Sequence, residues 1–297
     1  MSMDDYIDLP TVVDAAIADY PANWLYCLAD HAGVPGLHRT LVDSRLPWRS
    51  LFQGASEDAA LAAAPLLFSL GGRGERVSDN LLHWLSTHGT FTSSLLLLSS
   101  PLTLDELRAR LARRLHACVS EGMNVLLRFF DPRIFESLLT VLEYPQRDWF
   151  LSPADCWWYG DRYGVLQSWP SKHGDTEINF LLRLSETQEF ALLDASEIDQ
   201  VAAQLRSMLP DGYAGLGIAS RTAFLRRHMA EANSAGIVAT HELALYCGLA
   251  LLYGEDFSRT LRWQALLIKV QSGSATFAEA VAAQEASHGE RETDESF

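Results

Sequence analysis

The chain has 297 residues, of which 48% are hydrophobic, and its formal net charge is −15 at pH 7. This length and apolar content predict packed cores in two lobes and exclude a disordered chain. The excess of acid argues against a nucleic-acid partner, because affinity for phosphates comes from Lys and Arg. No apolar run is long enough to cross a bilayer and residues 1–20 lack a signal-peptide pattern, so we expect a cytoplasmic protein with no membrane partner.

Acidic residues are concentrated at the two ends of the sequence. Residues 1–20 carry five Asp and no base, and residues 285–297 carry five acids and one Arg. We predict an acidic leader over residues 1–21 and an acidic disordered tail over residues 287–297. Both segments would be solvated and keep the protein soluble.

Between residues 22 and 209 the sequence alternates strand-like and helical patterns. This alternation predicts an α/β (α+β) lobe with a mixed sheet and flanking helices. The clearest helix is 103–118, with Leu every three or four residues and four arginines on its other faces; these faces are either solvated or a surface for an acidic partner. The expected strands are the apolar or β-branched runs at 23–30, 65–70, 91–99, 156–159, 163–169 and 177–184.

The stretch Asn124–Arg133 (NVLLRFFDPR) is the most specific local pattern. It predicts a buried strand that ends at Asp131, which then caps a helix beginning at Pro132. Arg128 lies within the apolar run, so part of it should be buried and needs an acidic partner, either Asp131 or another acid. The pair would be a structural strut or part of a partner-binding surface.

After residue 209 the pattern becomes helical throughout. Pro210–Gly217 is glycine-rich and predicts a linker, followed by a small all-helical lobe over residues 218–286. Gly236 and Gly254 stand where helices commonly end in a left-handed residue. The helices expected in this lobe are 221–235, 241–253, 259–271 and 276–286.

The sequence contains no recognisable catalytic or metal-binding pattern. The nine His show no third ligand at close spacing, as H-E-x-x-H would require. The four Cys (27, 118, 156 and 247) lack C-x-x-C spacing and lie beside apolar residues, which predicts free buried thiols. The residues therefore point to no metal site, while a Cys/His hydrolase stays an alternative because catalytic groups meet only in space.

Tryptophan is concentrated in one expected hairpin. Trp157, Trp158 and Tyr159 precede a possible turn, and Tyr163 and Trp169 follow it. These side chains could line a recognition groove or pack across the hairpin in the core.

Four stretches in chain order resemble one family, the type VI secretion effector adaptors, also called effector chaperones and long classed as a domain of unknown function. They are Leu28-Ala29-Asp30, Trp48–Gly54 (like S-L-F-x-G), Ser94–Leu107, and Leu127–Arg133 (like R-F-Y-D-P-R). The resemblance covers roughly residues 22–155. It departs at Phe150-Leu151-Ser152-Pro153, where Ser replaces the Gly of the family's F-x-G-P.

The resemblance implies an adaptor in the cytoplasm that is not an enzyme and needs no cofactor. Such a protein binds a secreted effector, near its N-terminal or PAAR-like region, and helps load it onto the VgrG spike. The effector would contact a cleft between the lobes or an exposed aromatic patch. Our predicted partner-binding residues are Trp48, Leu51, Phe52, Arg128, Asp131, Arg133, Trp157 and Trp158. An alternative function is an immunity-type toxin inhibitor, which would need a compact acidic face.

Overall fold

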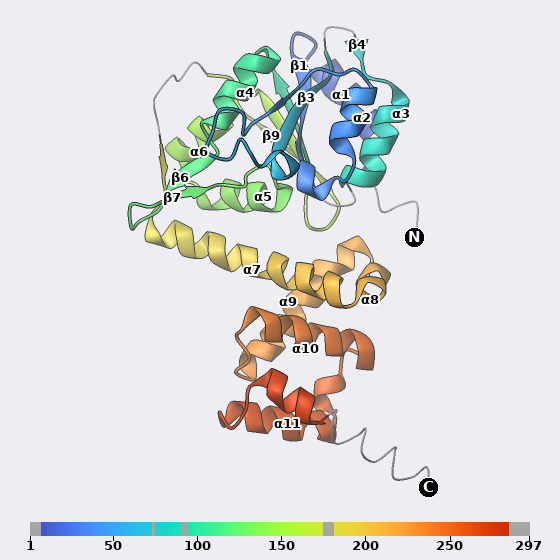
Figure 1. The fold of residues 1–297 in the computed structure, drawn as a ribbon, viewed down its shortest axis with the longest axis vertical. Helices are drawn as coiled ribbons and strands as arrows, with labels where there is room; N and C mark the ends of the chain where they lie inside the picture. Colours follow the sequence, from blue (N-terminus) through green and yellow to red (C-terminus); the bar gives the residue numbers. More distant parts are fainter. Residues whose placement is uncertain (1–6, 73–74, 91–93, 175–180, 285–297) are drawn as a thin grey trace. The chain divides into compact units, whose positions relative to one another are not determined.

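The computed structural model describes residues 7–72, 75–90, 94–174 and 181–284 (Figure 1). By its internal contacts the chain divides into a first unit, Met1–Asp194, and a second unit, Ala195–Phe297. The division falls within helix α7 (Glu186–Met208), before residue 209, where the sequence pattern placed the end of the α/β lobe. The acidic tail predicted over 287–297 lies outside the described residues.

The first unit contains a main sheet in which every described strand pair is antiparallel. Strand β1 lies in the middle, with Cys27 opposite Phe68 on one side and Leu97 on the other. The strand order is β2 (Trp48–Ser50), β3 (Pro65–Gly72), β1 (Trp24–Asp30), β5 (Leu95–Ser100), β8 (Cys156–Gly160) and β9 (Leu166–Pro170), with β4 (Glu75–Arg76) paired to β3.

A second, smaller sheet supplies the mixed pairing that the sequence predicted. Strand β6 (His116–Cys118) pairs in parallel with β10 (Leu182–Arg183) and antiparallel with β7 (Asn124–Leu126). Only the last residues of the strand expected at 177–184 lie in β10, and residues 175–180 are outside the described part of the chain. The predicted class, an α/β (α+β) lobe followed by an all-helical lobe, is confirmed.

Helices cover both faces of the main sheet (Figure 1). Tyr159 and Trp157 point to one face, where their rings lie 5.4 and 5.1 Å from that of Phe135 in α5. Trp158 points to the other face, 5.8 Å from Tyr20, which follows α1. The helices of the first unit are α1 (Leu9–Asp19), α2 (Leu37–Asp43), α3 (Asp79–Leu85), α4 (Leu104–Ala112), α5 (Pro132–Val141) and α6 (Tyr144–Leu151).

Because both faces of the sheet are covered, its central strands are apolar on both sides rather than alternating. All six residues of β5 and six of the seven in β1 are buried. Part of the predicted acidic leader belongs to this core, since α1 buries Leu9, Val13 and Ala16. Its aspartates lie among apolar residues at helical spacing, which lets one face pack while the other stays in solvent.

The second unit consists of helices joined by short connections and has no strand among its described residues. Tyr246 lies at the centre of its core, with ring centroids 4.9 Å from Phe257 and 5.8 Å from Phe277. The segment predicted as a linker, Pro210–Gly217, is mostly helix α8, which begins at a proline, a residue suited to a first helical turn. The helices are α7, α8 (Pro210–Gly215), α9 (Ile218–Ser234), α10 (Thr240–Tyr253), α11 (Leu261–Gln271) and residues 277–284.

Helix ends in the second unit follow the glycine signals. Gly236 and Gly254 have φ of +83° and +94°, a region that favours glycine, and they follow α9 and α10 closely. The four helices predicted after residue 218 are therefore confirmed to within a few residues at their described ends.

Candidate partner-binding site

The corner at Leu127–Arg133 joins strand β7 to helix α5. As predicted, Asp131 caps the helix by accepting a hydrogen bond from the Arg133 backbone N–H at 3.0 Å, and Pro132 is the first helical residue. The predicted strand through residue 130 is wrong. The backbone N–H of Phe129 donates to the Leu127 carbonyl (2.9 Å), and that of Asp131 donates to the Arg128 carbonyl (3.0 Å). Tight turns therefore replace the strand and bury Leu127, Phe129 and Phe130. The strand that does form, β7, is mostly exposed, so the predicted burial is also wrong there.

Two Arg–Asp pairs hold this corner. Arg133 donates from Nε and Nη2 to the two carboxylate oxygens of Asp131, at 2.9 and 2.7 Å. Arg128 donates from Nη2 to Oδ2 of Asp30 at 3.0 Å. The sequence left two possibilities for the partner of Arg128, Asp131 or another acid. The structure shows another acid, Asp30, which lies at the end of the central strand β1.

The Arg128–Asp30 pair is asymmetric in exposure. The Arg128 side chain is 54% exposed, whereas that of Asp30 is only 6% exposed. Burial raises the pKa of the Asp30 carboxyl above its usual value; the Arg128 charge acts in the opposite direction and the nearby Asp131 charge adds to the rise. The Arg128 guanidinium thus offers a solvent-facing cation anchored on a buried acid.

The segment Ser50–Gly54 packs against the same corner. Its turn is held by the Phe52 N–H, which donates to Ser50 Oγ at 3.1 Å, and ends at Gly54 with φ of +76°. The ring of Phe52 is buried and lies 6.3 Å from that of Phe130 in an edge-on contact. Two stretches separated by more than seventy residues therefore share one aromatic contact.

A groove of about 880 Å³ lies beside this turn, between edge strand β2 and helix α4. Arg49 and Asp105 form a bidentate pair across it, with N–O distances of 2.6 and 3.2 Å. That hydrogen bonding lowers the pKa of the Asp105 carboxyl. The groove is lined by Trp48, Arg49, Ser50, Gln53, Gly54, Asp58, Asp105 and Arg108.

Arginines also cover the backbone of edge strand β2. The Trp48 carbonyl accepts a hydrogen bond from Arg49 Nη1 at 2.9 Å, and the Ser50 carbonyl accepts one from Arg108 Nε at 3.2 Å. Open edge carbonyls invite pairing with another strand, and side chains that occupy them reduce that tendency. The groove is thus suited to side-chain recognition of a polar peptide more than to addition of a strand.

Residues 25–148 match the family model described as "Domain of unknown function (DUF4123)". The match covers less than half of the chain, includes the four stretches that carry the resemblance, and leaves the second unit outside. No curated protein and no solved structure gives a significant match.

The four matched stretches converge in the first unit. Asp30 of the first stretch binds Arg128 of the fourth, Phe52 of the second contacts Phe130 of the fourth, and Asp105 of the third binds Arg49 of the second. The backbone N–H of Asp30 also donates to the Ser94 carbonyl at 2.9 Å. Sequence similarity along the chain thus corresponds to one continuous region in space.

The predicted partner-binding residues divide into an accessible and a buried group. Trp48, Arg128 and Arg133 keep part of their surface exposed. The other five are buried: Leu51, Phe52, Asp131, Trp157 and Trp158.

The Trp157–Trp158 hairpin packs in the core and does not line a recognition groove. Trp157 is fully buried and donates from Nε1 to the Leu151 carbonyl at 3.1 Å, and Trp158 is 8% exposed. Leu51 and Phe52 are core residues for the same reason, since the turn directs both inward. A partner-binding role for all eight residues stays a prediction, but only three of them present accessible side-chain surface.

The position predicted for Arg114 is wrong: the sequence pattern placed it on an outer face of a helix, but the structure buries it. It lies beyond α4, which ends at Ala112 instead of continuing to residue 118, and it is 4% exposed. Its guanidinium donates to the carbonyls of Trp149 and Phe150, the latter at 2.7 Å, and stacks over the Trp149 ring at 4.3 Å. The signal that misled was Leu115, which continues the leucine periodicity although the helix has already ended.

The cysteines are buried, and two exposed histidines contact the backbone of their own helical turn. All four cysteines are free and buried, as predicted, and burial raises the pKa of the Cys247 thiol to about 12. His83 and His88 contact the backbone carbonyls of Asp79 and Trp84 at 2.8 Å. Among the described residues, no group of three or more His, Cys, Asp or Glu is arranged to hold a metal, and no helix is long and apolar enough to cross a bilayer.

Proposed function

We propose that this protein is a cytoplasmic adaptor that binds a type VI secretion effector, at its N-terminal or PAAR-like region, and helps load it onto the VgrG spike. The observation that carries the proposal is the convergence of the four family-like stretches on one region of the first unit. The matched family is associated with effector adaptors, which supports the same function.

The accessible part of this region gives the proposal a contact surface. Arg128 presents a cation at the corner, Trp48 presents an aromatic ring beside the groove, and Gln53 is exposed at its rim. Arg and Trp are enriched among residues that dominate binding at protein interfaces. We propose that an effector segment with an acidic residue near an apolar side chain binds here, pairing with Arg128 and packing on Trp48.

The buried thiols argue for binding over covalent catalysis. A cysteine nucleophile acts as the thiolate, and burial makes the thiolate of Cys27, Cys156 and Cys247 unfavourable. We propose on this basis that the protein has no hydrolase activity of its own.

Co-expression tests the proposal directly. The chain is expressed with the product of the adjacent downstream gene, either complete or lacking its N-terminal region, and captured by affinity purification. We expect stable 1:1 capture of the complete product and loss of capture on truncation. If the folded, monodisperse protein captures neither form, the adaptor function is wrong, and inhibition of a toxin's activity becomes the function to assay.

Surface variants then locate the contact. We expect Arg128→Glu and Trp48→Ala to weaken capture while circular dichroism shows that both variants stay folded. Arg39→Glu is the control, because Arg39 is 88% exposed on α2 and pairs only with Asp43, four residues on, among the described residues. Equal capture by all three variants would place the effector elsewhere on the protein.

A further inference from the structure

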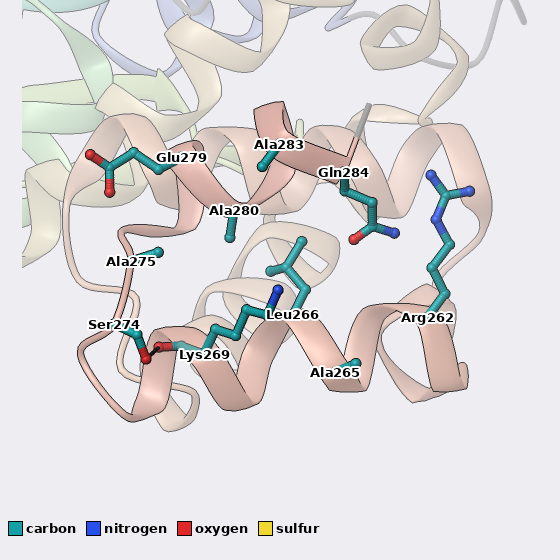
Figure 2. A pocket seen from close by; sticks show the side chains of 10 residues that line it. All are labelled: Arg262, Ala265, Leu266, Lys269, Ser274, Ala275, Glu279, Ala280, Ala283 and Gln284. Carbon is teal, nitrogen blue, oxygen red and sulfur yellow. Dashed lines mark hydrogen bonds between the residues drawn. The ribbon is translucent and has the colours of Figure 1, made fainter. Parts of the chain in front are cut away.

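The second unit has its own groove, between α11 and the helical segment 277–284 (Figure 2). Its volume is about 610 Å³. The side chains of Leu266, Ala280 and Ala283 point into it and make an apolar floor (Figure 2). Short alanine side chains on both walls leave room for a guest helix to approach closely.

Two cations stand along the α11 wall of this groove. Arg262 and Lys269 both line it, and neither forms a salt bridge with an acid within the described part of the chain. The Arg262 guanidinium lies over the Trp263 ring at 5.6 Å, which leaves its N–H donors for a ligand. The acid on the opposite wall, Glu279, accepts a hydrogen bond from the Thr276 backbone N–H, and this bond lowers the pKa of its carboxyl.

An apolar ridge borders the groove on the outer side of α11. Leu261 and Ile268 are 86% and 63% exposed, and Ala265 lies between them on the same helix face. Apolar side chains at i, i+4 and i+7 usually point to a core, but here the opposite face, with Trp263 and Leu266, fills that role. The ridge is therefore available to pack against a bound partner.

We propose that this groove binds an acidic amphipathic helix of a partner protein. Arg262 and Lys269 are seven residues apart, or about 10.5 Å along the axis at the rise of an α-helix. Two acids at i and i+7 of the guest match that spacing, with apolar residues at i+3 and i+4 over Leu266 and Ala265. Charge complementarity selects the acids, and the exposed ridge selects the apolar residues. The proposal is independent of the adaptor function proposed above.

A synthetic probe tests the assignment without any knowledge of the natural partner. The probe is a fluorescein-labelled 15-residue alanine-based helix with Glu at positions 4 and 11 and Leu at positions 7 and 8. Two matched peptides carry Gln or Lys in place of both Glu residues. Fluorescence anisotropy with the full chain should show the Glu probe binding about tenfold more tightly than the Gln probe, and the Lys probe binding least.

Reciprocal charge changes make the test specific to the groove. We expect the double variant Arg262→Glu, Lys269→Glu to bind the Glu probe at least tenfold more weakly than the wild type does. The same variant should bind the Lys probe more tightly. Arg206→Glu is the control, because Arg206 is an exposed cation of the second unit that does not line the groove. Ala283→Trp fills the groove without changing charge and should abolish binding of the Glu probe, with circular dichroism confirming the fold of each variant.

Other occupants give different outcomes, each of which overturns the proposal. If an unlabelled peptide of residues 285–297 competes as well as the unlabelled Glu probe, acidity alone or the chain's own segment explains the binding. If light scattering shows a dimer that Leu261→Gln dissociates, the ridge belongs to a second copy. If the three probes bind equally, or if Ala283→Trp binds normally, the groove is not the binding site.

Discussion

The two grooves of this protein contain similar cations that are used in different ways. In the first unit, Arg49 pairs with Asp105 and Arg108 donates to the Ser50 carbonyl, so both are held by the fold. In the second unit, Arg262 and Lys269 have no acidic partner among the described residues. Each groove is lined by two cations, so counting cations alone would rank the grooves alike. The difference lies in whether the protein already neutralises those charges, which decides how much attraction is left for a ligand.

Arg114 is the extreme case of a cation used by the fold. Burial lowers the pKa of its guanidinium to about 9, so it stays protonated at neutral pH. It is bound by carbonyls near the end of α6 instead of by a carboxylate. Unsatisfied carbonyls at a helix C-terminus carry partial negative charge, which explains how a buried cation is stabilised without an acid.

The largest expected effect is that of Arg114→Met. The variant leaves the buried carbonyl of Phe150 without its donor and takes one donor from that of Trp149, which also accepts from Ser152. We expect it to lower the free energy of unfolding by about 3–5 kcal/mol. Urea denaturation followed by circular dichroism measures the change. Arg113→Met, at the exposed neighbouring position, should cost less than about 0.5 kcal/mol. Equal effects at the two positions would show that Arg114 is not a structural cation.

Next in size is the effect of Asp131→Ala. The change removes a helix cap and leaves the Arg133 guanidinium without its bidentate partner, so we expect a loss of about 2–4 kcal/mol. Asp131→Asn keeps an oxygen that can cap α5 and should lose roughly half as much. Thermal unfolding of the two variants separates the cap from the ion pair. An Asn variant as unstable as the Ala variant would mean that the charge pair carries the whole effect.

These residues also show which parts of the fold were predictable. The Asp131 cap is local, because donor and acceptor lie two residues apart, and the D-P pattern was sufficient to predict it. The contacts of Arg128 with Asp30 and of Phe52 with Phe130 join distant residues, and periodicity carries no information about which distant groups meet. The Trp157–Trp158 hairpin was predicted as a hairpin, but its burial depended on helices covering both faces of the sheet, which its own sequence does not encode.

A smaller effect, dependent on pH, is expected for Arg128→Gln. Burial already makes ionised Asp30 unfavourable in the folded state, and removing the Arg128 charge raises the pKa of that carboxyl further. The folded state then binds the Asp30 proton more tightly than the unfolded state does. The penalty is therefore present above the folded-state pKa and disappears as the pH falls through it.

At pH 7 we expect the Arg128→Gln variant to be less stable than the wild type by about 1 kcal/mol. Thermal unfolding measured at a series of pH values should show the two proteins converging toward acid pH. A difference that is constant with pH would mean that Arg128 stabilises the corner by packing on Phe130, over which its guanidinium lies at 5.8 Å, and not by its charge.

Arg49→Gln tests the cation of the first groove. Its pair with Asp105 is largely exposed, and exposed pairs contribute little to stability because solvent screens them. We expect no resolvable change in Tm. The groove should become more negatively charged, because Asp105 then loses its cationic partner. Effector capture at high and low salt measures the consequence: weaker capture of an acidic segment, mainly at low salt. Capture that is unchanged at both salt concentrations would place the effector outside this groove.

The smallest effect on stability is expected for Arg262→Gln in the second groove. Because no acid among the described residues pairs with this guanidinium, its removal breaks no internal ion pair, and we expect the free energy of unfolding to change by less than about 0.5 kcal/mol. Added salt should leave that difference unchanged, since there is no internal attraction to screen. Urea denaturation at two salt concentrations measures both quantities. A clear, salt-sensitive destabilisation would reveal a pairing partner for Arg262, and the second groove would then use its cation as the first groove does.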